Sequence, residues 1–128
     1  MMSRKFRWVP PILWGLLIII LSLIPGGPGN LQLFGIPHID KIGHFGMYAV
    51  WAFLVYRAFI AGGGISPNKS MWFSFLILTL IGITLEFGQD LLTEYRSYEV
   101  ADMLANGLGA LIGSLMGWFF RKHKTVRT

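Results

Sequence analysis

Four long apolar segments are the feature that most constrains how this chain can fold. They cover residues 8–24, 40–60, 71–92 and 100–120, and between them lie a proline- and glycine-rich run at 25–30, three glycines at 62–64 and a polar stretch. At a rise of about 1.5 Å per residue, segments of this length extend roughly 25 to 33 Å, which matches a hydrocarbon core of about 30 Å. The sequence therefore predicts an all-α, integral membrane four-helix bundle, with residues 1–128 forming a single domain.

Composition excludes several classes of protein. Hydrophobic residues make up 54% of the chain and charged residues only 13%, whereas a soluble domain carries about 25% charged residues. The lack of cysteine excludes disulfide frameworks, cysteine-based zinc sites and thiol nucleophiles. The net charge of +5 does not indicate nucleic-acid binding, because a basic groove needs polar surface that this chain does not have. We therefore expect no nucleic-acid partner.

A cleaved secretory signal is the alternative for the first apolar segment, because Arg4, Lys5 and Arg7 precede it as a basic n-region would. The segment is longer than the usual apolar region of roughly 7 to 15 residues, and no small-x-small cleavage site follows it. We therefore expect it to be retained as the first transmembrane helix.

Basic and acidic residues separate along the chain in a way that predicts its orientation. With both termini in the cytoplasm, nine of the 11 Lys and Arg residues lie on the cytoplasmic side, and only Lys41 and Arg96 lie outside. All six acidic residues then lie outside. Because cytoplasmic loops are enriched in Lys and Arg, we expect a multi-pass protein of the bacterial cytoplasmic (inner) membrane with cytoplasmic N and C termini.

Polar residues recur at steps of three and four near the extracytoplasmic ends of the last three segments, so they share one face of each helix. Counting from the helix ends places His44, Glu86 and Asn106 about 6 to 9 Å inside the boundary. Ionisable groups at this depth face the bundle interior or a wet cavity. The layer is therefore a predicted ligand-binding site. Its candidate residues are Asp40, Lys41, His44, Tyr48, Glu86, Gln89, Asp90, Arg96, Asp102 and Asn106.

Three functions fit this layer. The first is binding of an amphiphilic, anionic or lipid-anchored ligand, such as a membrane lipid, at the extracytoplasmic leaflet, because helix N-termini with Lys41 and Arg96 favour a phosphate-like group. The second is an enzyme acting on a lipid or polyprenyl substrate, in which the candidate catalytic residues are His44 as general base and Glu86 as its partner. The third is a structural role in which the layer only joins helices through hydrogen bonds. Clustering of the residues favours binding, and the sequence leaves open whether any reaction is catalysed.

Metal binding is a further reading of the same residues. The i,i+4 pairs Asp40 with His44 and Glu86 with Asp90 have the spacing of metal ligands on a helix. Only one of the three histidines lies at the depth of the layer, since the others fall in a loop and in the basic tail. A zinc site would favour more imidazole, so we expect no metal ligands and no cofactor.

Glycines follow a four-residue spacing in the last segment, at Gly109, Gly113 and Gly117. Small residues at this spacing allow two helices to pack closely in a membrane. We expect the glycines to serve helix packing in the first place, and the same surface is the predicted contact of a homo-oligomer.

Three motifs in order resemble the VanZ-like family of small bacterial membrane proteins. The family pattern contains an Asp-Lys-x-x-His-x-x-x-Tyr element, a Glu-x-x-Gln element and a later element with Arg and Asp-x-x-x-Asn-x-x-Gly. The matching residues are Asp40, Lys41, His44 and Tyr48, then Glu86 and Gln89, then Arg96, Asp102, Asn106 and Gly109. The resemblance covers residues 38–117. It implies a short bundle of transmembrane helices and, because the family is named for a protein linked to low-level teicoplanin resistance, a link with resistance to that glycopeptide.

Overall fold

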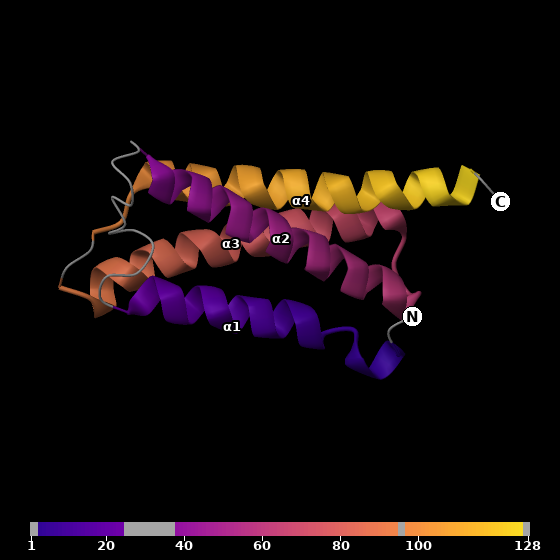
Figure 1. Ribbon diagram of the computed structural model, residues 1–128, viewed down its shortest axis with the longest axis horizontal. Helices are drawn as coiled ribbons and strands as arrows, with labels where there is room; N and C mark the ends of the chain where they lie inside the picture. Colours follow the sequence, from indigo (N-terminus) through magenta and orange to yellow (C-terminus); the bar gives the residue numbers. More distant parts are fainter. Residues whose placement is uncertain (1–2, 25–37, 95–96, 127–128) are drawn as a thin grey trace.

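The computed structural model describes residues 3–24, 38–94 and 97–126. After a short 3-10 turn, η1 (Arg4–Phe6), the chain forms four α-helices, and this part of the chain contains no strand (Figure 1). The helices are α1 (Val9–Leu23), α2 (Ile39–Gly62), α3 (Pro67–Leu92) and α4 (Val100–Val126). The prediction of an all-α chain with four helices is confirmed.

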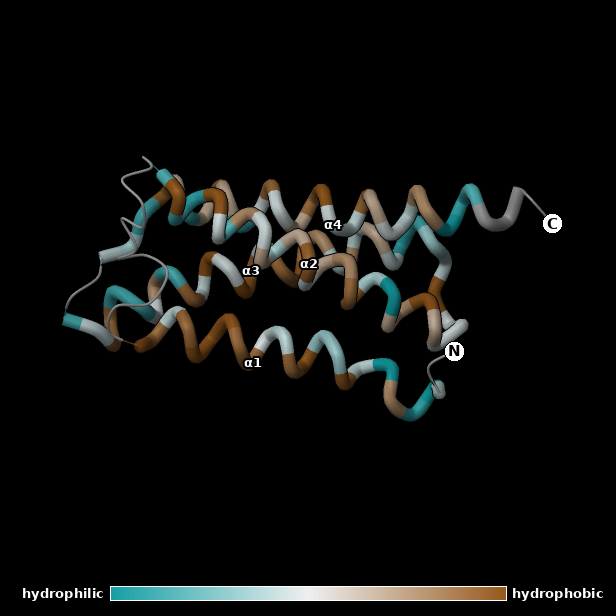
Figure 2. The backbone as a smooth tube through the Cα atoms, in the orientation of Figure 1, coloured by the Kyte–Doolittle hydropathy of each residue, from teal (hydrophilic) through white to brown (hydrophobic). Residues whose placement is uncertain are grey.

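All four helices are long and apolar enough to cross a membrane. Large apolar side chains such as Leu13, Leu80 and Leu104 are exposed on the outside of the bundle. Hydrophilic residues gather at the two ends of the molecule instead (Figure 2). Exposed apolar surface of this extent requires contact with lipid, and the chain is therefore a multi-pass membrane protein.

The helices run alternately up and down. α2 packs most extensively against α4, α3 packs against both, and α1 packs against α2 and α3 (Figure 1). Indole hydrogen bonds join the outer helices to their neighbours: Trp14 Nε1 donates to the carbonyl of Met47 at 3.0 Å, and Trp118 Nε1 donates to Asn68 Oδ1 at 2.8 Å. Because successive helices run in opposite directions, the start of α1 and the end of α4 lie at the same end of the bundle (Figure 1).

The opposite end is formed by the last residues of α1 and α3 and the first residues of α2 and α4 (Figure 1). We call it the polar end, because it holds the buried acids at the start of α4 and near the end of α3, Asp102 and Glu86. The polar residues that the sequence places at one depth therefore lie at one end of the bundle.

α3 and α4 extend furthest beyond their predicted bounds. α3 begins at Pro67 rather than at 71, because the Ser66 hydroxyl accepts a hydrogen bond from the amide of Lys69 at 3.4 Å and proline is favoured in a first turn. α4 continues past 120 to Val126. Basic residues such as Arg121 and Lys122 stabilise a helix near its C-terminus, so the basic stretch prolongs the helix rather than ending it.

The glycines of α4 face α2. A Cβ atom at Gly109 or Gly113 would overlap the backbone carbonyl oxygen of Phe45 or Ala49, and one at Gly117 would overlap the ring of Tyr56. The predicted close packing is therefore confirmed, and its partner is a helix of the same chain. A homo-oligomer through these three glycines would have to displace α2 from them.

Candidate polar site

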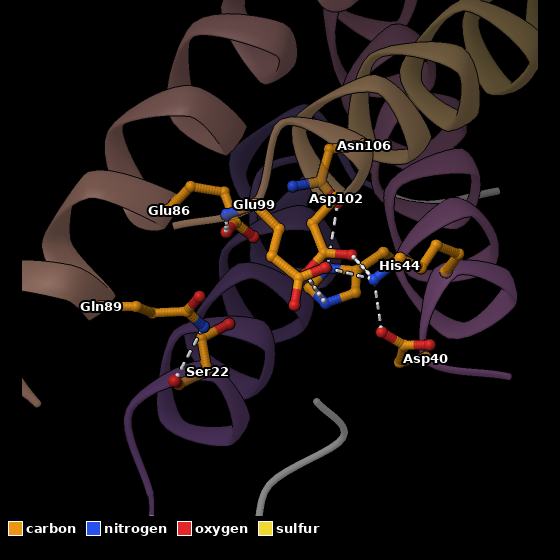
Figure 3. A network of polar contacts seen from close by, with 9 residues as sticks. Ser22, Asp40, His44, Glu86, Gln89, Glu99, Asp102 and Asn106 are labelled. Atoms are coloured by element: carbon orange, nitrogen blue, oxygen red, sulfur yellow. Dashed lines mark hydrogen bonds and ion pairs between the residues drawn. The ribbon is translucent and has the colours of Figure 1, made fainter. Parts of the chain in front are cut away.

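The candidate site lies at the polar end, where side chains from α2, α3, α4 and the residue before α4 turn toward one another (Figure 3). Helix geometry places them: each helix contributes residues three or four positions apart, which lie on one face. The residues brought together are Asp40, Lys41, His44, Glu86, Gln89, Glu99, Asp102 and Asn106.

The outer part of the site, which we call the rim, is an ion-pair cluster around Lys41. Its Nζ atom lies 2.7 Å from Asp40 Oδ2, 2.5 Å from Glu99 Oε2 and 2.9 Å from Asp102 Oδ1. The side chains of Lys41 and Asp40 are partly exposed, and that of Glu99 is 53% exposed. One ammonium group is therefore shared among three carboxylates contributed by two separate segments.

The inner part of the site, which we call the floor, consists of His44, Glu86 and Asp102. Each of the three residues is at least 95% buried. One donor atom from each lies within 4.8 Å of one donor atom from each of the others. Three helices thus place an imidazole and two carboxylates in mutual contact range inside the bundle.

Asn106 orients the imidazole of the floor. His44 Nδ1 lies 3.1 Å from Asn106 Oδ1. An amide oxygen can only accept a hydrogen bond, so Nδ1 donates and carries the proton of the neutral ring. Nε2 then points toward the acid, 3.7 Å from Asp102 Oδ2. The side-chain amide of Asn106 therefore helps to fix the orientation of the His44 ring.

Helix packing below the floor depends on a small residue in α3. A Cβ atom at Gly82 would lie 3.0 Å from Asn106 Cβ and 3.2 Å from Tyr48 Cε1. Glycine therefore lets α3 approach the other two helices at this level. Tyr48 is buried there, one turn beyond His44, and packs against Trp51 with ring centroids 5.6 Å apart.

Gln89 connects the site to α1. Its Nε2 donates a hydrogen bond to the backbone carbonyl of Ser22 at 2.8 Å, and Gln89 lies one turn from Glu86 on the same face of α3 (Figure 3). The end of α1 is thereby held beside the site.

Comparison with known families identifies the chain. The family model described as VanZ/LLP1 matches residues 4–121. The chain belongs to the VanZ/LLP1 family. The match extends the motif resemblance to α1 and covers almost the whole chain. Neither the curated proteins nor the solved structures include a significant match to this chain.

The three motifs that this VanZ/LLP1 chain carries converge at the polar end. Five of the ten predicted site residues lie in the rim or the floor, and Asn106 contacts the floor directly. Tyr48 and Gln89 are buried one turn away from His44 and Glu86 on the same helices. Asp90 is exposed on α3, and within the described residues no hydrogen bond or ion pair joins it to the cluster. Arg96 falls outside the described residues.

Two contributors to the site were not predicted from the sequence. Glu99 brings both a rim carboxylate and a backbone amide that donates to Glu86 Oε2 at 3.4 Å. Its position immediately before α4, where acids favour a helix N-terminus, is the signal that could have identified it. Ser22 takes part through its backbone carbonyl, a group that no side-chain pattern reports.

The described residues of the site include more acids than bases. Four carboxylates, those of Asp40, Glu86, Glu99 and Asp102, surround the single ammonium of Lys41. Lys41 is already paired with three of them, so it does not offer an uncompensated positive charge to a phosphate. Arg96, the second basic residue predicted for this site, lies outside the described residues.

A separate cavity of about 840 Å³ lies at the other end of the bundle, between α2 and α4. Its lining includes Tyr56, Arg57 and Arg121. None of the described site residues lines it, so it is distinct from the polar site.

Proposed function

We propose that this multi-pass membrane protein binds the polar head group of an amphiphilic or lipid-anchored ligand at the extracytoplasmic leaflet. The observation that carries the proposal is the burial of His44, Glu86 and Asp102, from three helices, at one end of a bundle with an apolar exterior. Ionisable residues placed in this way within membrane segments are typical of binding and transport sites.

The energies favour binding over packing as the reason for the cluster. An ionisable residue within a membrane segment costs about 2.5 to 3.5 kcal/mol at the centre of the bilayer and less near its surface. Interhelical hydrogen bonds contribute about 0.6 kcal/mol on average. Helix association in this chain is already served by the glycines of α4 against α2, so joining helices does not require three buried ionisable groups.

Charge and exposure narrow the ligand class. The rim is partly exposed and carries three carboxylates around one ammonium. A head group with an amine fits this surface better than a head group with a net negative charge, because it can share the acids with Lys41. The ligand we propose is therefore an amphiphile whose polar part carries a primary amine.

The charges at the two ends of the bundle support the proposed orientation. Basic residues such as Arg57, Lys69 and Arg121 belong to the end opposite the polar end. Cytoplasmic surfaces are enriched in Lys and Arg, so the polar site would face the extracytoplasmic leaflet.

A membrane enzyme acting on a lipid or polyprenyl substrate is the second candidate. The observation that favours it is the hydrogen bond from His44 Nδ1 to Asn106 Oδ1, which makes Nε2 the basic nitrogen of the ring, as a general base requires. Chemical conversion of the bound lipid, rather than its retention, would identify this function.

Lipid retention tests the binding proposal. The protein is placed in nanodiscs that contain equal amounts of phosphatidylethanolamine and phosphatidylglycerol, and lipids retained on its release are identified by native mass spectrometry. We expect retention of phosphatidylethanolamine by the wild type and about tenfold weaker retention by Glu99→Gln, since a charge-assisted hydrogen bond contributes about 1.5 kcal/mol or more.

Glu94→Gln is the matched control, because Glu94 is an exposed carboxylate in the same connection. Equal retention by both variants, or a preference for phosphatidylglycerol, would contradict the proposal. Glu99 is exposed, so folding of the variant is expected and is checked by circular dichroism.

Teicoplanin provides a second probe from the same class, because it is an amphiphile with an acyl tail that acts at the outer membrane surface. If this chain shares the resistance role for which the family is named, a susceptible bacterium that expresses the wild type or Glu94→Gln should tolerate more teicoplanin than one that expresses Glu99→Gln. Equal inhibitory concentrations in all strains would show that this chain does not confer teicoplanin resistance. The lipid-retention result would still stand.

A further inference from the structure

We propose that His44, Glu86 and Asp102 together bind one divalent transition-metal cation, with Zn²⁺ as the best-matched ion. This inference goes beyond the proposed function and does not depend on it, because a cation can bind at the floor whether or not an amphiphile contacts the rim. It also replaces the expectation from the sequence that the chain holds no metal ligands.

The ligand set differs from the pairs that helical spacing suggests. Each residue of the floor comes from a different helix, and the set has one imidazole and two carboxylates. Protein sites that hold Zn²⁺ use these donor types, and three protein ligands with an open position are typical of catalytic zinc. Asp90, the i,i+4 partner of Glu86, is exposed and is not part of the set.

The distances are close to those of a formed site. Donor atoms of the three residues all lie within 4.8 Å of one another. Ligands of a tetrahedral ion held at about 2.1 Å lie about 3.4 Å apart, so closure requires the donor atoms to approach one another by up to about 1.4 Å. His44 Nε2 and Asp102 Oδ2, at 3.7 Å, are already close to that separation, and 3.7 Å is too long for a direct hydrogen bond.

The ring of His44 is held in the orientation that a metal ligand needs. Its Nδ1–H donates to Asn106 Oδ1, so the lone pair of the neutral ring is on Nε2, the nitrogen that faces the carboxylates. Metal-ligating histidines almost always donate the other ring N–H to an oxygen acceptor in this way. Asn106 thus acts as a positioning residue for the proposed site.

Asp102 divides its two oxygens between the rim and the floor. Oδ1 lies 2.9 Å from Lys41 Nζ, whereas Oδ2 faces His44. One oxygen can therefore remain paired with Lys41 while the other binds a cation, so metal binding does not require the rim to open.

The neighbouring amide of Gln89 provides an independent observation. Gln89 is 99% buried, its nitrogen donates to Ser22, and its Oε1 has no hydrogen-bond partner among the described residues. Figure 3 shows this amide beside Glu86, with its nitrogen turned toward Ser22 and its oxygen on the side of Glu86. Buried polar atoms nearly always have a partner, and an oxygen beside a carboxylate is stabilised by a cation or by a water bound to one.

The mixture of donors selects the class of metal. Imidazole favours Zn²⁺ and other first-row transition metals, whereas Mg²⁺ and Ca²⁺ prefer sites built only from oxygen. We therefore expect Zn²⁺ to bind more tightly than Mg²⁺.

The test measures zinc on the full chain in detergent after removal of metals with EDTA. Zinc affinity is determined by competition with a zinc-sensitive dye, and zinc content after desalting by mass spectrometry. We expect one site per chain in the wild type and in His123→Gln, and at least tenfold weaker affinity in His44→Gln and Glu86→Gln. His123 lies at the opposite end of α4, so its variant controls for the loss of an imidazole. No bound zinc, or equal zinc affinity in His44→Gln and His123→Gln, would overturn the proposal.

A measurement on the unmodified chain covers the case in which the floor variants do not fold. Co²⁺ is added in place of Zn²⁺, and its visible absorption reports low-coordinate binding by nitrogen and oxygen ligands. We expect an absorption band that Zn²⁺ abolishes and Mg²⁺ does not; a spectrum identical to that of aqueous Co²⁺ would overturn the proposal. Zinc is measured here without lipid, and lipid retention can be repeated after EDTA treatment, so failure of either proposal is distinguishable from failure of the other.

Discussion

At the scale of single residues, the geometry of the site depends on a few side chains that each contact groups from another segment. Lys41 pairs with three carboxylates, and Asn106 accepts a hydrogen bond from the His44 ring. Both contacts join α2 to α4 or to the residue before it. The orientation of the floor is therefore set by a few short polar contacts between these two segments.

Removal of the Asn106 side chain tests this dependence. Asn106→Ala leaves the buried Nδ1–H of His44 without that acceptor, which is expected to lower the free energy of unfolding by about 1 to 3 kcal/mol. The measurement is reversible unfolding in mixed detergent, with EDTA present so that metal does not contribute.

Asn68→Ala makes the same substitution at the exposed acceptor of Trp118, where water can replace the lost amide, and is expected to change stability by no more than about 0.5 kcal/mol. Similar losses of unfolding free energy in both variants would mean that the contact to His44 contributes no more to stability than an exposed hydrogen bond does.

Part of the site follows from residue spacing, and part does not. Counting from the helix ends predicted that His44, Glu86 and Asn106 lie at one depth, and the structure brings them together with Asp102. Spacing reports which face of a helix a residue occupies but not which partner it meets. It therefore did not predict that Lys41 is shared by three acids, or that Glu99, which precedes the helix, contributes to the site.

At the scale of helices, the pairing of α2 with α4 has the most exacting geometry. The backbones approach so closely at Gly109 and Gly113 that a methyl group would meet a carbonyl oxygen. A backbone atom cannot turn aside as a side chain can, so added volume must separate the helices.

A pair of substitutions in one helix isolates this effect. Gly113→Ala is expected to lower the free energy of unfolding by about 1 to 3 kcal/mol or more, because its Cβ would overlap the carbonyl of Ala49. Gly107→Ala on the same helix places a Cβ 3.7 Å from Thr79, an ordinary contact, so it should leave stability unchanged or raise it by up to about 1 kcal/mol. Detergent unfolding of both variants checks this, and equal stability would show that the close approach is absent in solution.

The sequence predicted the existence and type of all four helices, but their ends less well. Long apolar runs identify the membrane spans, and the glycine spacing identified a packing face. The bounds of α3 and α4 depend on groups outside the apolar runs, namely the hydroxyl of Ser66 and the basic residues after Phe120. Hydropathy alone gives these groups no weight.

At the scale of the whole molecule, the two ends of the bundle differ in charge. The polar end collects buried acids, and the opposite end carries basic residues such as Arg57 and Arg121. Successive helices run in opposite directions, so each of the four helices connects the acidic end to the basic end. The separation of charge was predicted from the sequence; which helices become neighbours was not, because side-chain shape decides that.

Single cysteines test the orientation that the charges favour. The chain has no cysteine, Ser97 is exposed at the polar end, and a Cβ at Gly64 would meet nothing within 4 Å at the other end. With the polar end outside, Ser97→Cys should react with a membrane-impermeant thiol reagent in intact cells, and Gly64→Cys only after permeabilisation. The reverse pattern would place the polar site in the cytoplasm.

The location of the outer helix ends has a practical consequence. α1 starts and α4 finishes at the end remote from Lys41 and Glu99 (Figure 1). An immobilising tag joined beyond α4 would hold the molecule on a sensor chip with the polar end facing the flowing solution. Immobilisation by that route, unlike random coupling through lysines, would leave the Lys41 amine unmodified for measurements of small cations and amines.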